Sequence, residues 1–206
     1  MIGDSKNHWE RIYSTKKSNE VSWTQEIPST SLNFLRSFNI TKNSSIIDIG
    51  GGESRLVDFL LGEGFNDVTV LDISGHALQH AKDRLGEKAD KVQWIVSDIT
   101  EFKPTRKYDV WHDRATFHFL TTRTQINKYV SLATNFINTS GYMTIGTFSD
   151  HGPNKCSGID VAKYSERTLN NVLKSHFEKI RCITEDHITP FRTHQNFLFC
   201  SFRKAI

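Results

Sequence analysis

The chain has 206 residues, which suits one α/β domain with a sizeable core and is short for two domains. Charged residues make up 24% of the sequence and hydrophobic residues 37%, a balance typical of globular rather than disordered proteins. The net charge of +3 comes without a long Lys/Arg tract, so nucleic acid is not expected as a partner.

The cysteines and the distribution of apolar residues disfavour disulfide-rich, metal-binding, secreted and membrane-spanning proteins. Cys156, Cys182 and Cys200 are odd in number and lack C-x-x-C spacing, so neither a disulfide framework nor a metal site is expected. Cys182 and Cys200 fall in expected strands, where we predict small buried apolar residues. The N-terminus holds no apolar signal segment, and no stretch approaches the ~20 apolar residues of a membrane span. We therefore expect a cytoplasmic monomer without a membrane partner.

The first 28 residues are polar and aromatic and end at Pro28, which is typical of an appendage in front of a core. We expect residues 1–28 to form this appendage and residues 29–206 to form the core of the same single domain. Apolar residues recur at helical spacing within 31–38, which predicts a helix there.

From residue 45 onward, short apolar segments alternate with amphipathic ones. Expected strands cover residues 46–49, 68–71, 92–96, 108–111 and 142–148. Expected helices cover residues 55–61, 74–85 and 124–136. Strands that are apolar enough to be buried on both faces, alternating with helices, predict an α/β fold with a mostly parallel sheet.

The C-terminal part has a different pattern. A helix is expected over residues 165–175, and two strand-like segments follow over 178–185 and 195–202 with only a turn between them. Two consecutive strands without a helix between them must run antiparallel. We therefore expect an antiparallel hairpin at the C-terminal end of the sheet.

A glycine-rich loop, Asp48-Ile49-Gly50-Gly51-Gly52-Glu53-Ser54, follows the first strand and opens the next helix. This is the position required of a nucleotide-binding turn, and its glycines let a ligand approach the backbone. A carboxylate at Asp48, inside an otherwise apolar strand, is costly without a purpose. Arg55 stands where the dinucleotide fingerprint G-x-G-x-x-G needs its third glycine, so a nucleotide-dependent oxidoreductase is the less favoured alternative.

Three more carboxylates follow other strands, at the edge where open α/β sheets bind ligands. Asp72 ends the second strand and can accept hydrogen bonds from both hydroxyls of a ribose. Asp98 and Ile99 follow the third strand, where a carboxylate beside an apolar side chain suits adenine. Asp113 follows the fourth strand, in the segment His112-Asp113-Arg114. Together with the glycine-rich loop, this spacing predicts a site for a nucleoside ligand.

These motifs resemble those of the class I S-adenosylmethionine-dependent methyltransferases. Asp48-Ile49-Gly50-Gly51-Gly52 matches their D-x-G-x-G motif, with Ser54 where the family often has a further glycine. The resemblance covers residue 46 to about residue 202. It implies a Rossmann-like, seven-stranded, mostly parallel sheet with a C-terminal antiparallel hairpin. It also implies S-adenosyl-L-methionine as the cofactor and S-adenosyl-L-homocysteine as the product.

The resemblance also assigns parts of the cofactor to parts of the chain. Gly50 to Gly52 would lie against the methionine moiety, Asp72 would hold the ribose, and Asp98 with Ile99 would hold the adenine. The aromatic residues of the appendage would either form a lid, with Trp23 against the sulfonium by cation–π attraction, or only fix the appendage to the core. The full set expected to bind the cofactor is Asp48, Gly50, Gly51, Gly52, Ser54, Asp72, Ile73, Asp98, Ile99, Asp113, Trp23 and Tyr13.

Two segments resemble a narrower group, the protein-lysine methyltransferases acting on elongation factor 1A or citrate synthase. Asp113-Arg114-Ala115-Thr116-Phe117 is similar to their D-K-G-T-[FL] segment, although His118 stands where they often carry Asp. His8-Trp9-Glu10 with Tyr13, and Val21-Ser22-Trp23, look like the N-terminal signature of branches that include protein-lysine methyltransferases and thiopurine methyltransferase-like enzymes. The combination of His112-Asp113-Arg114-Ala115 with Lys155-Cys156-Ser157-Gly158 is similar to a bacterial branch. The resemblance implies methyl transfer to a protein lysine or a similar nitrogen nucleophile. A small-molecule thiol, nitrogen or oxygen acceptor and a non-catalytic S-adenosylmethionine-binding module stay open as alternatives.

Methyl transfer from a sulfonium is an in-line displacement, so the enzyme mainly holds donor and acceptor in near-attack geometry. The residues expected on the acceptor side follow the fourth and fifth strands: His112, Asp113, His118, Asp150 and His151. Among these we expect Asp113, with His112, to act near the methionine end or the acceptor. A nucleic-acid base is a disfavoured acceptor, because the segment after the fourth strand does not read N-P-P-Y.

Overall fold

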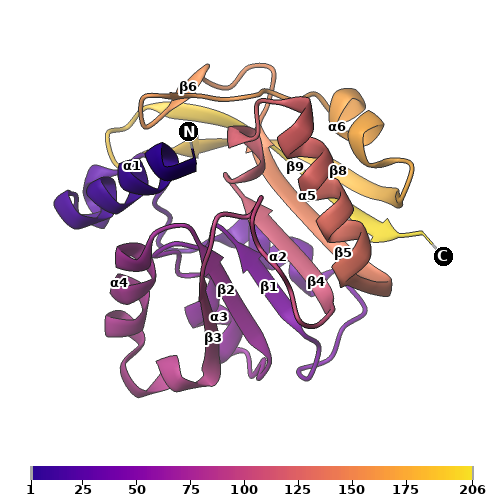
Figure 1. Cartoon of the computed structure of the whole chain (residues 1–206), viewed down its shortest axis with the longest axis horizontal. Helices are drawn as coiled ribbons and strands as arrows, with labels where there is room; N and C mark the ends of the chain where they lie inside the picture. Colours follow the sequence, from indigo (N-terminus) through magenta and orange to yellow (C-terminus); the bar gives the residue numbers. More distant parts are fainter. Residues whose placement is uncertain (1, 206) are drawn as a thin grey trace.

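Seven strands form one sheet in the computed structural model, which describes the backbone of residues 2–205 and the side chains of residues 5–205. The strand order is β3-β2-β1-β4-β5-β9-β8. The parallel strands are β1 (Ile46–Ile49), β2 (Val68–Asp72), β3 (Val92–Val96), β4 (Tyr108–Arg114) and β5 (Ile137–Phe148). β9 (His194–Lys204) runs antiparallel to both β5 and β8 (Phe177–Ile188). The predicted α/β class and the C-terminal antiparallel hairpin are therefore confirmed (Figure 1).

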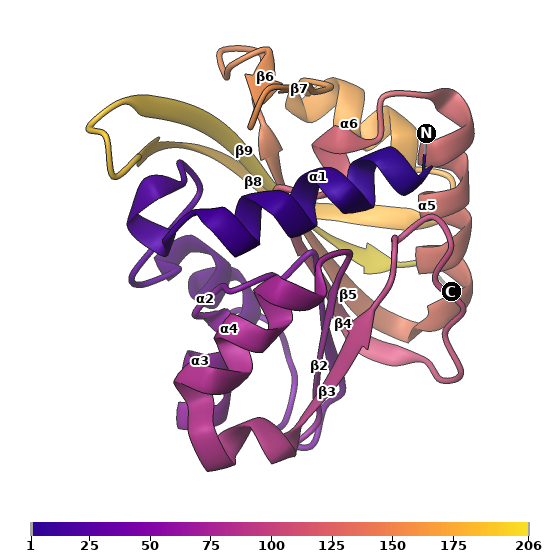
Figure 2. The same ribbon diagram turned by 60° about the vertical axis from the view of Figure 1, so that its left-hand side comes forward.

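Helices cover both faces of this sheet. α2 (Ser29–Arg36), α3 (Leu56–Gly62) and α4 (Gly75–Leu85) pack on one face, and α5 (Arg123–Phe136) and α6 (Glu166–Leu173) pack on the other (Figure 2). Every residue of β1 and β2 is buried, as expected for central strands that are covered on both sides. The remaining elements are the 3₁₀ turns η1 (Ser18–Glu20), η2 (Gly86–Lys91) and η3 (Phe117–Phe119), and the short strands β6 (Lys155–Cys156) and β7 (Ile159–Asp160).

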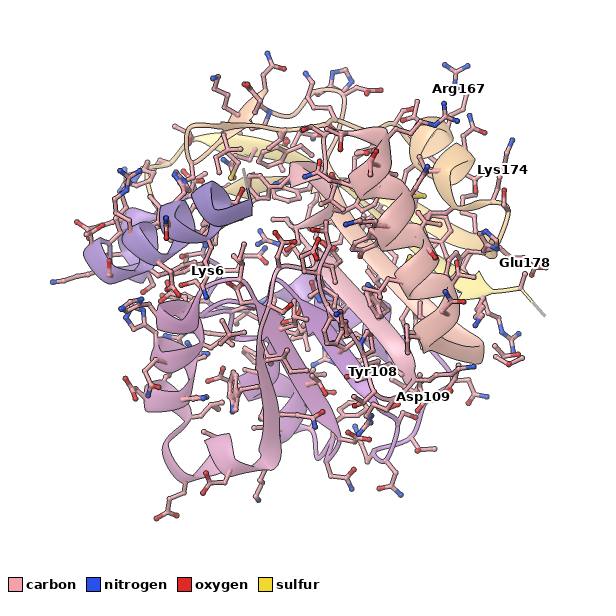
Figure 3. All side chains as sticks on the ribbon, in the orientation of Figure 1. Lys6, Tyr108, Asp109, Arg167, Lys174 and Glu178 are labelled. Atoms are coloured by element: carbon pink, nitrogen blue, oxygen red, sulfur yellow. A yellow bond between two sulfur atoms is a disulfide. The ribbon has the colours of Figure 1, made fainter. Side chains whose placement is uncertain are left out.

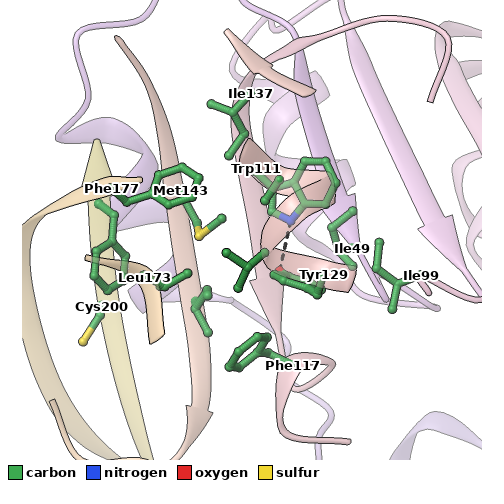
Figure 4. Close-up of a cluster of buried hydrophobic side chains, with 14 of the residues drawn as sticks. Ile49, Ile99, Trp111, Phe117, Tyr129, Ile137, Met143, Leu173, Phe177 and Cys200 are labelled. Atoms are coloured by element: carbon green, nitrogen blue, oxygen red, sulfur yellow. Dashed lines mark hydrogen bonds between the residues drawn. The ribbon is translucent and has the colours of Figure 1, made fainter. Parts of the chain in front are cut away.

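The larger core cluster lies between the central strands and the helices α5 and α6. Trp111 of β4 packs edge-on against Tyr129 of α5, with ring centroids 6.0 Å apart (Figure 4). The Trp111 indole N–H donates to the Tyr129 hydroxyl over 3.0 Å, and that hydroxyl donates to Asp113 over 2.7 Å. Both aromatic side chains are fully buried. Their hydrogen bonds fasten the end of β4 to α5.

The appendage contains a helix that the sequence analysis did not predict. α1 (Ile2–Thr15) lies beside α4 and runs across the carboxyl ends of the strands (Figure 2). Tyr108 and Asp109, at the start of β4, lie well away from Lys6 of α1 (Figure 3). α1 therefore covers the edge of the sheet at which the predicted ligand-binding residues lie. No helix in the described part of the chain has the length and apolar character needed to cross a membrane.

Cys182 of β8 and Cys200 of β9 form a disulfide, so the prediction that both are unpaired apolar residues is wrong. The two residues face each other in the antiparallel register, with Cα atoms 4.1 Å apart. The sequence does not reveal this pairing, because the register depends on the turn and on an irregularity between Lys179 and Arg181. Cys156 is buried and carries a free thiol.

We predict that alkylation of the denatured, non-reduced chain labels Cys156 alone, and that reduction makes all three cysteines reactive. The disulfide joins residues separated by 18 positions, so reduction should lower the free energy of unfolding by about 3 kcal/mol. The melting temperature of a domain of this size then falls by roughly 6–12 °C. The double variant Cys182→Ala/Cys200→Ala is the control, because its melting temperature should not respond to reductant. Three labelled cysteines without reduction would contradict the assignment.

Candidate functional site

A cavity of about 810 Å³ opens at the carboxyl edge of the sheet. Its walls come from the loops after β1, β2, β3 and β4, from the appendage, and from the tip of the β8–β9 hairpin. The volume lies within the range of cofactor and small-molecule sites, ~300–1,000 Å³. The predicted residues that line it are Tyr13, Trp23, Asp48, Gly50, Gly51, Ser54, Asp72, Ile73, Asp98, Ile99 and His112.

The turn after β1 requires glycine because of its protein neighbours as well as any ligand. Gly50 has a φ of +62°, and a Cβ atom there would collide with the Thr116 side chain. Gly52 has a φ of +52°, and a Cβ atom there would lie 2.8 Å from the Tyr13 hydroxyl of α1. Glycine adopts such backbone angles without steric cost. The loop is therefore packed between the exit of β4 and α1, although Gly52 itself does not line the cavity.

Asp48, His112 and Ser31 form a buried hydrogen-bond chain at the cavity wall. His112 Nδ1 lies 2.7 Å from Asp48 Oδ1, and His112 Nε2 lies 2.8 Å from Ser31 Oγ. Asp48 and His112 are paired across β1 and β4, and Ser31 comes from the first turn of α2. Their exposed fractions are 3%, 2% and 1%, and all three residues line the cavity. A His112 ring with one proton donates a hydrogen bond from Nδ1 to the Asp48 carboxylate and accepts one from the Ser31 hydroxyl at Nε2. Both ring nitrogens are therefore engaged.

Asp72 lies buried at the end of β2. Its Oδ1 accepts a hydrogen bond from the backbone N–H of Ser74 over 2.8 Å. Burial raises the pKa of Asp72 to about 7, against hydrogen bonds from Ser74 and Gly52 and with a contribution from the charges of Asp48 and Glu10. Donor groups on a ligand would favour the charged form of this carboxylate.

Asp98 and Ile99 form the cavity wall after β3. Asp98 Oδ1 accepts from the backbone N–H and from the hydroxyl of Thr100, both over 2.8 Å. This turn fixes the carboxylate beside Ile99, whose side chain belongs to the core beneath. The pair combines a hydrogen-bond acceptor with an apolar surface, which is the combination predicted to suit adenine.

Glu10 of α1 caps the N-terminus of α4. Its carboxylate accepts from the Ser74 hydroxyl over 2.7 Å and from the backbone N–H groups of Gly75 and His76 over 3.0 and 3.1 Å, and it lies 2.7 Å from His76 Nδ1. Partial burial acts to raise the pKa of Glu10, but these hydrogen bonds outweigh it and lower the pKa to about 2. Because α4 begins shortly after Asp72, this contact fastens α1 beside that residue.

Trp9, Tyr13 and Trp23 of the appendage form an aromatic cluster with Phe119, and all four line the cavity. Ring centroids are 5.6 Å apart for Trp9 and Trp23, 6.1 Å for Tyr13 and Trp23, and 5.2 Å for Trp9 and Phe119. The cluster joins the appendage to η3 and forms part of the cavity wall. The sequence left two roles open for these aromatic residues, fixing the appendage to the core and forming a lid over the ligand. The two roles are therefore compatible.

Asp113 does not line the cavity, which corrects its expected place beside the cofactor or acceptor. Its fully buried carboxylate accepts from the backbone N–H groups of Thr116 and Phe117, each over 3.1 Å, and from the Tyr129 hydroxyl. Burial raises the pKa of Asp113 to about 6, although these hydrogen bonds favour the charged form. Thr116 fills the space over Gly50. Asp113 is thus connected to the glycine-rich loop through Thr116.

Of the other residues expected on the acceptor side, His112 lines the cavity, whereas His118, Asp150 and His151 lie outside its wall. His118 is fully buried and stacks on Phe148, with ring centroids 4.5 Å apart. Burial and the charge of Arg114 lower the pKa of His118 to about 3, so its ring is neutral. Asp150 and His151 are exposed in the turn after β5.

Several residues of the cavity wall were not predicted from the sequence, among them Ser31, Arg114 and His187. His187 is buried in β8 and donates from Nε2 to the Ser22 carbonyl over 2.7 Å. Burial lowers the pKa of His187, and the nearby charge of Arg114 acts in the same direction. No local motif marks Ser31 or His187, because each reaches the cavity from an element distant in sequence from the glycine-rich loop. Arg114 lies in the segment that resembles the protein-lysine methyltransferases. Its side chain faces the cavity because β4 extends to this residue, and the sequence did not predict that extension.

The chain is similar to several known methyltransferases. A family profile described as a methyltransferase domain matches residues 46–141. Malonyl-[acyl-carrier protein] O-methyltransferase 2 of Ilyobacter polytropus is 28% identical over 105 residues, which cover 50% of this chain and 39% of that protein. N-terminal Xaa-Pro-Lys N-methyltransferase 1-B of Xenopus laevis is 29% identical over 121 residues, which cover 53% of this chain and 54% of that protein. The chain thus spans less than two thirds of the length of these curated relatives.

Solved structures share the fold at lower sequence identity. N-methyltransferase NodS from Bradyrhizobium japonicum, in complex with S-adenosyl-L-homocysteine, has a TM-score of 0.74 at 16% identity, over 98% of this chain and 99% of that chain. TehB from Haemophilus influenzae has a TM-score of 0.70 at 19% identity, over 95% of this chain and 67% of that chain. In its matched domain, its glycine-rich motif and its fold, the chain is similar to the class I S-adenosylmethionine-dependent methyltransferases.

Proposed function

We propose that the chain binds S-adenosyl-L-methionine in the cavity and transfers its methyl group to an acceptor, leaving S-adenosyl-L-homocysteine. The observation that carries this proposal is the order of groups along the sheet edge. β3, β2 and β1 are neighbours, and the residues that follow them bring Asp98, Asp72 and the glycine-rich loop to one cavity in that order. Adenine, ribose and methionine follow one another in the same order in the cofactor.

The donor and acceptor groups of the cavity fit each part of this cofactor. Asp72 would accept hydrogen bonds from the ribose hydroxyls, and Asp98 with Ile99 would hold the adenine. The backbone of the glycine-rich loop would lie along the methionine moiety. Asp48, oriented by His112, would offer its carboxylate to the ammonium group of that moiety.

Catalysis in this proposal depends on placement. The bound cofactor supplies an electrophilic methyl group on a sulfonium, and the aromatic wall at Trp23 would favour that cation. Both nitrogens of His112 and both oxygens of Asp113 are occupied by hydrogen bonds, so we assign these residues to positioning and not to proton transfer. Holding donor and acceptor in near-attack geometry can supply ~7–11 kcal/mol of the barrier.

For the acceptor, the first candidate is a protein lysine or a similar nitrogen nucleophile. The resemblance of the Asp113–Phe117 segment supports it, as does the relative named as an N-terminal Xaa-Pro-Lys N-methyltransferase. A small molecule is the second candidate. It is favoured by the cavity wall, to which the appendage and the hairpin tip both contribute and which leaves a volume suited to small ligands.

Incubation of the chain with methyl-labelled cofactor and a cell lysate separates these candidates. Label in a protein band supports a protein acceptor, and label in the small-molecule extract supports a metabolite. Cofactor that binds but gives no labelled product in either fraction would contradict methyl transfer and indicate a non-catalytic binding module.

We predict that calorimetry detects binding of S-adenosyl-L-homocysteine and no binding of NAD. Asp72→Asn should weaken S-adenosyl-L-homocysteine binding by roughly 10- to 100-fold at about pH 8, because hydrogen bonds to a carboxylate contribute about 1.5–3 kcal/mol. Since the pKa of Asp72 is raised to about 7, wild-type affinity should increase as the pH rises through that value and Asp72 ionises.

Asp72→Asn should lack this part of the pH dependence, whereas titration of the ligand itself affects both proteins equally. Asp67→Asn is the matched control, because Asp67 lies just before β2 and pairs with Arg106 outside the cavity. Equal pH profiles for wild type and Asp72→Asn would count against the assigned role of Asp72.

We also predict that Glu10→Gln raises the dissociation constant of S-adenosyl-L-homocysteine by roughly tenfold. The substitution keeps the shape of the side chain but removes the charge that fastens α1 to α4, and charge-assisted hydrogen bonds contribute about 1.5 kcal/mol or more. Glu87→Gln in η2 is the control, because it makes the same charge change outside the cavity wall. Calorimetry that gives the same affinity for Glu10→Gln and wild type would reject a role of α1 in holding the cofactor.

A further inference from the structure

Arg114 brings a positive charge to the cavity wall at the end of β4, two strands away from Asp72 in β2. Because side chains alternate along a strand, Arg114 shares the face of His112 and not that of Asp113. Its Nη1 donates to the Trp23 carbonyl over 3.0 Å. These positions put the guanidinium between the parallel core and the appendage.

The guanidinium is held in place but incompletely paired. Its carbon lies 4.9 Å from the centroid of the Phe197 ring. Its Nε and Nη2 are shielded from solvent and make no hydrogen bond to any described residue. Buried donors are nearly always paired in proteins, so two unpaired N–H-bearing nitrogens on one side chain require an explanation.

Arg114 has no direct ion-pair partner. It takes part in none of the ion pairs formed within the described part of the chain. The carboxylates of Glu185 and Asp48 interact with its charge from a distance; Asp48 is hydrogen-bonded to His112, and Glu185 is hydrogen-bonded to Thr30 through Oε2, while its Oε1 is buried without a hydrogen-bond partner. Burial raises the pKa of the Cys156 thiol to about 11, so this neighbour is uncharged near neutral pH. A guanidinium edge that is shielded from solvent and has no direct ion-pair partner is costly, which is tolerable where a ligand supplies the partner.

We propose that Arg114 binds a carboxylate of the methyl acceptor, which is therefore a small organic acid. This inference rests on the proposed methyl transfer and narrows its acceptor. A carboxylate matches the planar fork of guanidinium donors, and the Nε and Nη2 edge can pair with both of its oxygens. Because that edge is shielded, the wall around Arg114 has to open as the acceptor binds. The carboxylate serves as a binding group, whichever atom of the acceptor receives the methyl.

The methionine carboxylate of the cofactor has the same chemistry and is the alternative source of the anion. The cavity wall favours the acceptor. The methionine moiety is assigned to the loop after β1, whereas Phe119, Cys156, Ile159 and Ile188 give the wall beyond β4 an apolar part, beside the polar His187 and Thr189. This apolar part of the wall suits the uncharged body of an organic acid, with Arg114 as its charged end.

The test measures carboxylate binding to the full chain saturated with S-adenosyl-L-homocysteine. The probes are malonate, succinate, adipate and benzoate, each compared with its amide by calorimetry. We expect at least one carboxylate to bind wild type more tightly than its amide, and Arg114→Met to weaken that binding by roughly 10- to 100-fold. Arg114→Lys should lose less, because it keeps the charge but not the fork. Arg181→Met is the matched control, since Arg181 is exposed, stacks on Phe34 at 4.1 Å and does not line the cavity.

A separate titration with S-adenosyl-L-homocysteine keeps the two proposals apart. If wild type does not bind it, the proposed function fails, whatever Arg114 does. If wild type binds it but none of the carboxylates, or binds them equally well with Arg114→Met, the carboxylate site is overturned. A loss of S-adenosyl-L-homocysteine affinity in Arg114→Met, with carboxylate binding unchanged, would assign Arg114 to the cofactor and also overturn it. We expect Arg114→Met to melt no lower than wild type, because it removes a shielded charge that has no direct ion-pair partner.

Discussion

A carboxylate held inside the most buried part of the sheet is the constraint on which the site depends. Asp48 lies in β1 among isoleucines, where an unpaired charge would be strongly destabilising. Its partner His112 comes from the neighbouring strand β4, and Ser31 completes the chain from α2. β1, β4 and α2 must therefore all be in place before the Asp48 carboxylate and its partner His112 have their hydrogen bonds. Asp48 is the first residue of the glycine-rich loop, and the first glycine follows two residues later, so the same contacts fix the start of the surface assigned to the cofactor.

Two additions to the parallel core shape the cavity from different sides. α1 is fastened by Glu10 to the start of α4, beside the end of β2. The β8–β9 hairpin, joined by a disulfide, places His187 in the opposite part of the wall. The two sides of the cavity also differ in charge. The negative Asp72 lies on the side assigned to the cofactor, and the positive Arg114 lies on the side assigned to the acceptor. In this proposal the parallel core and α1 hold the nucleoside ligand, and the hairpin contributes to the part of the cavity assigned to the acceptor.

The strands, the hairpin and the carboxylates at strand ends could be predicted because each follows from a local pattern. Side-chain direction at the end of β4 could not, since a shift of one position decides whether Asp113 or its neighbours face the cavity. The disulfide escaped prediction because it depends on hairpin register, and α1 because few apolar side chains mark its buried face. Ser31 and His187 meet the loop only through tertiary packing.

The central claim is that Asp48 and His112 act as one unit in holding the cofactor loop. The most direct measurement is a double-mutant cycle with Asp48→Asn and His112→Gln, read by the calorimetric dissociation constant of S-adenosyl-L-homocysteine. The account predicts that each single variant binds at least tenfold more weakly and that the double variant is no worse than the weaker single. Additive losses, or folded single variants with wild-type affinity, would contradict it.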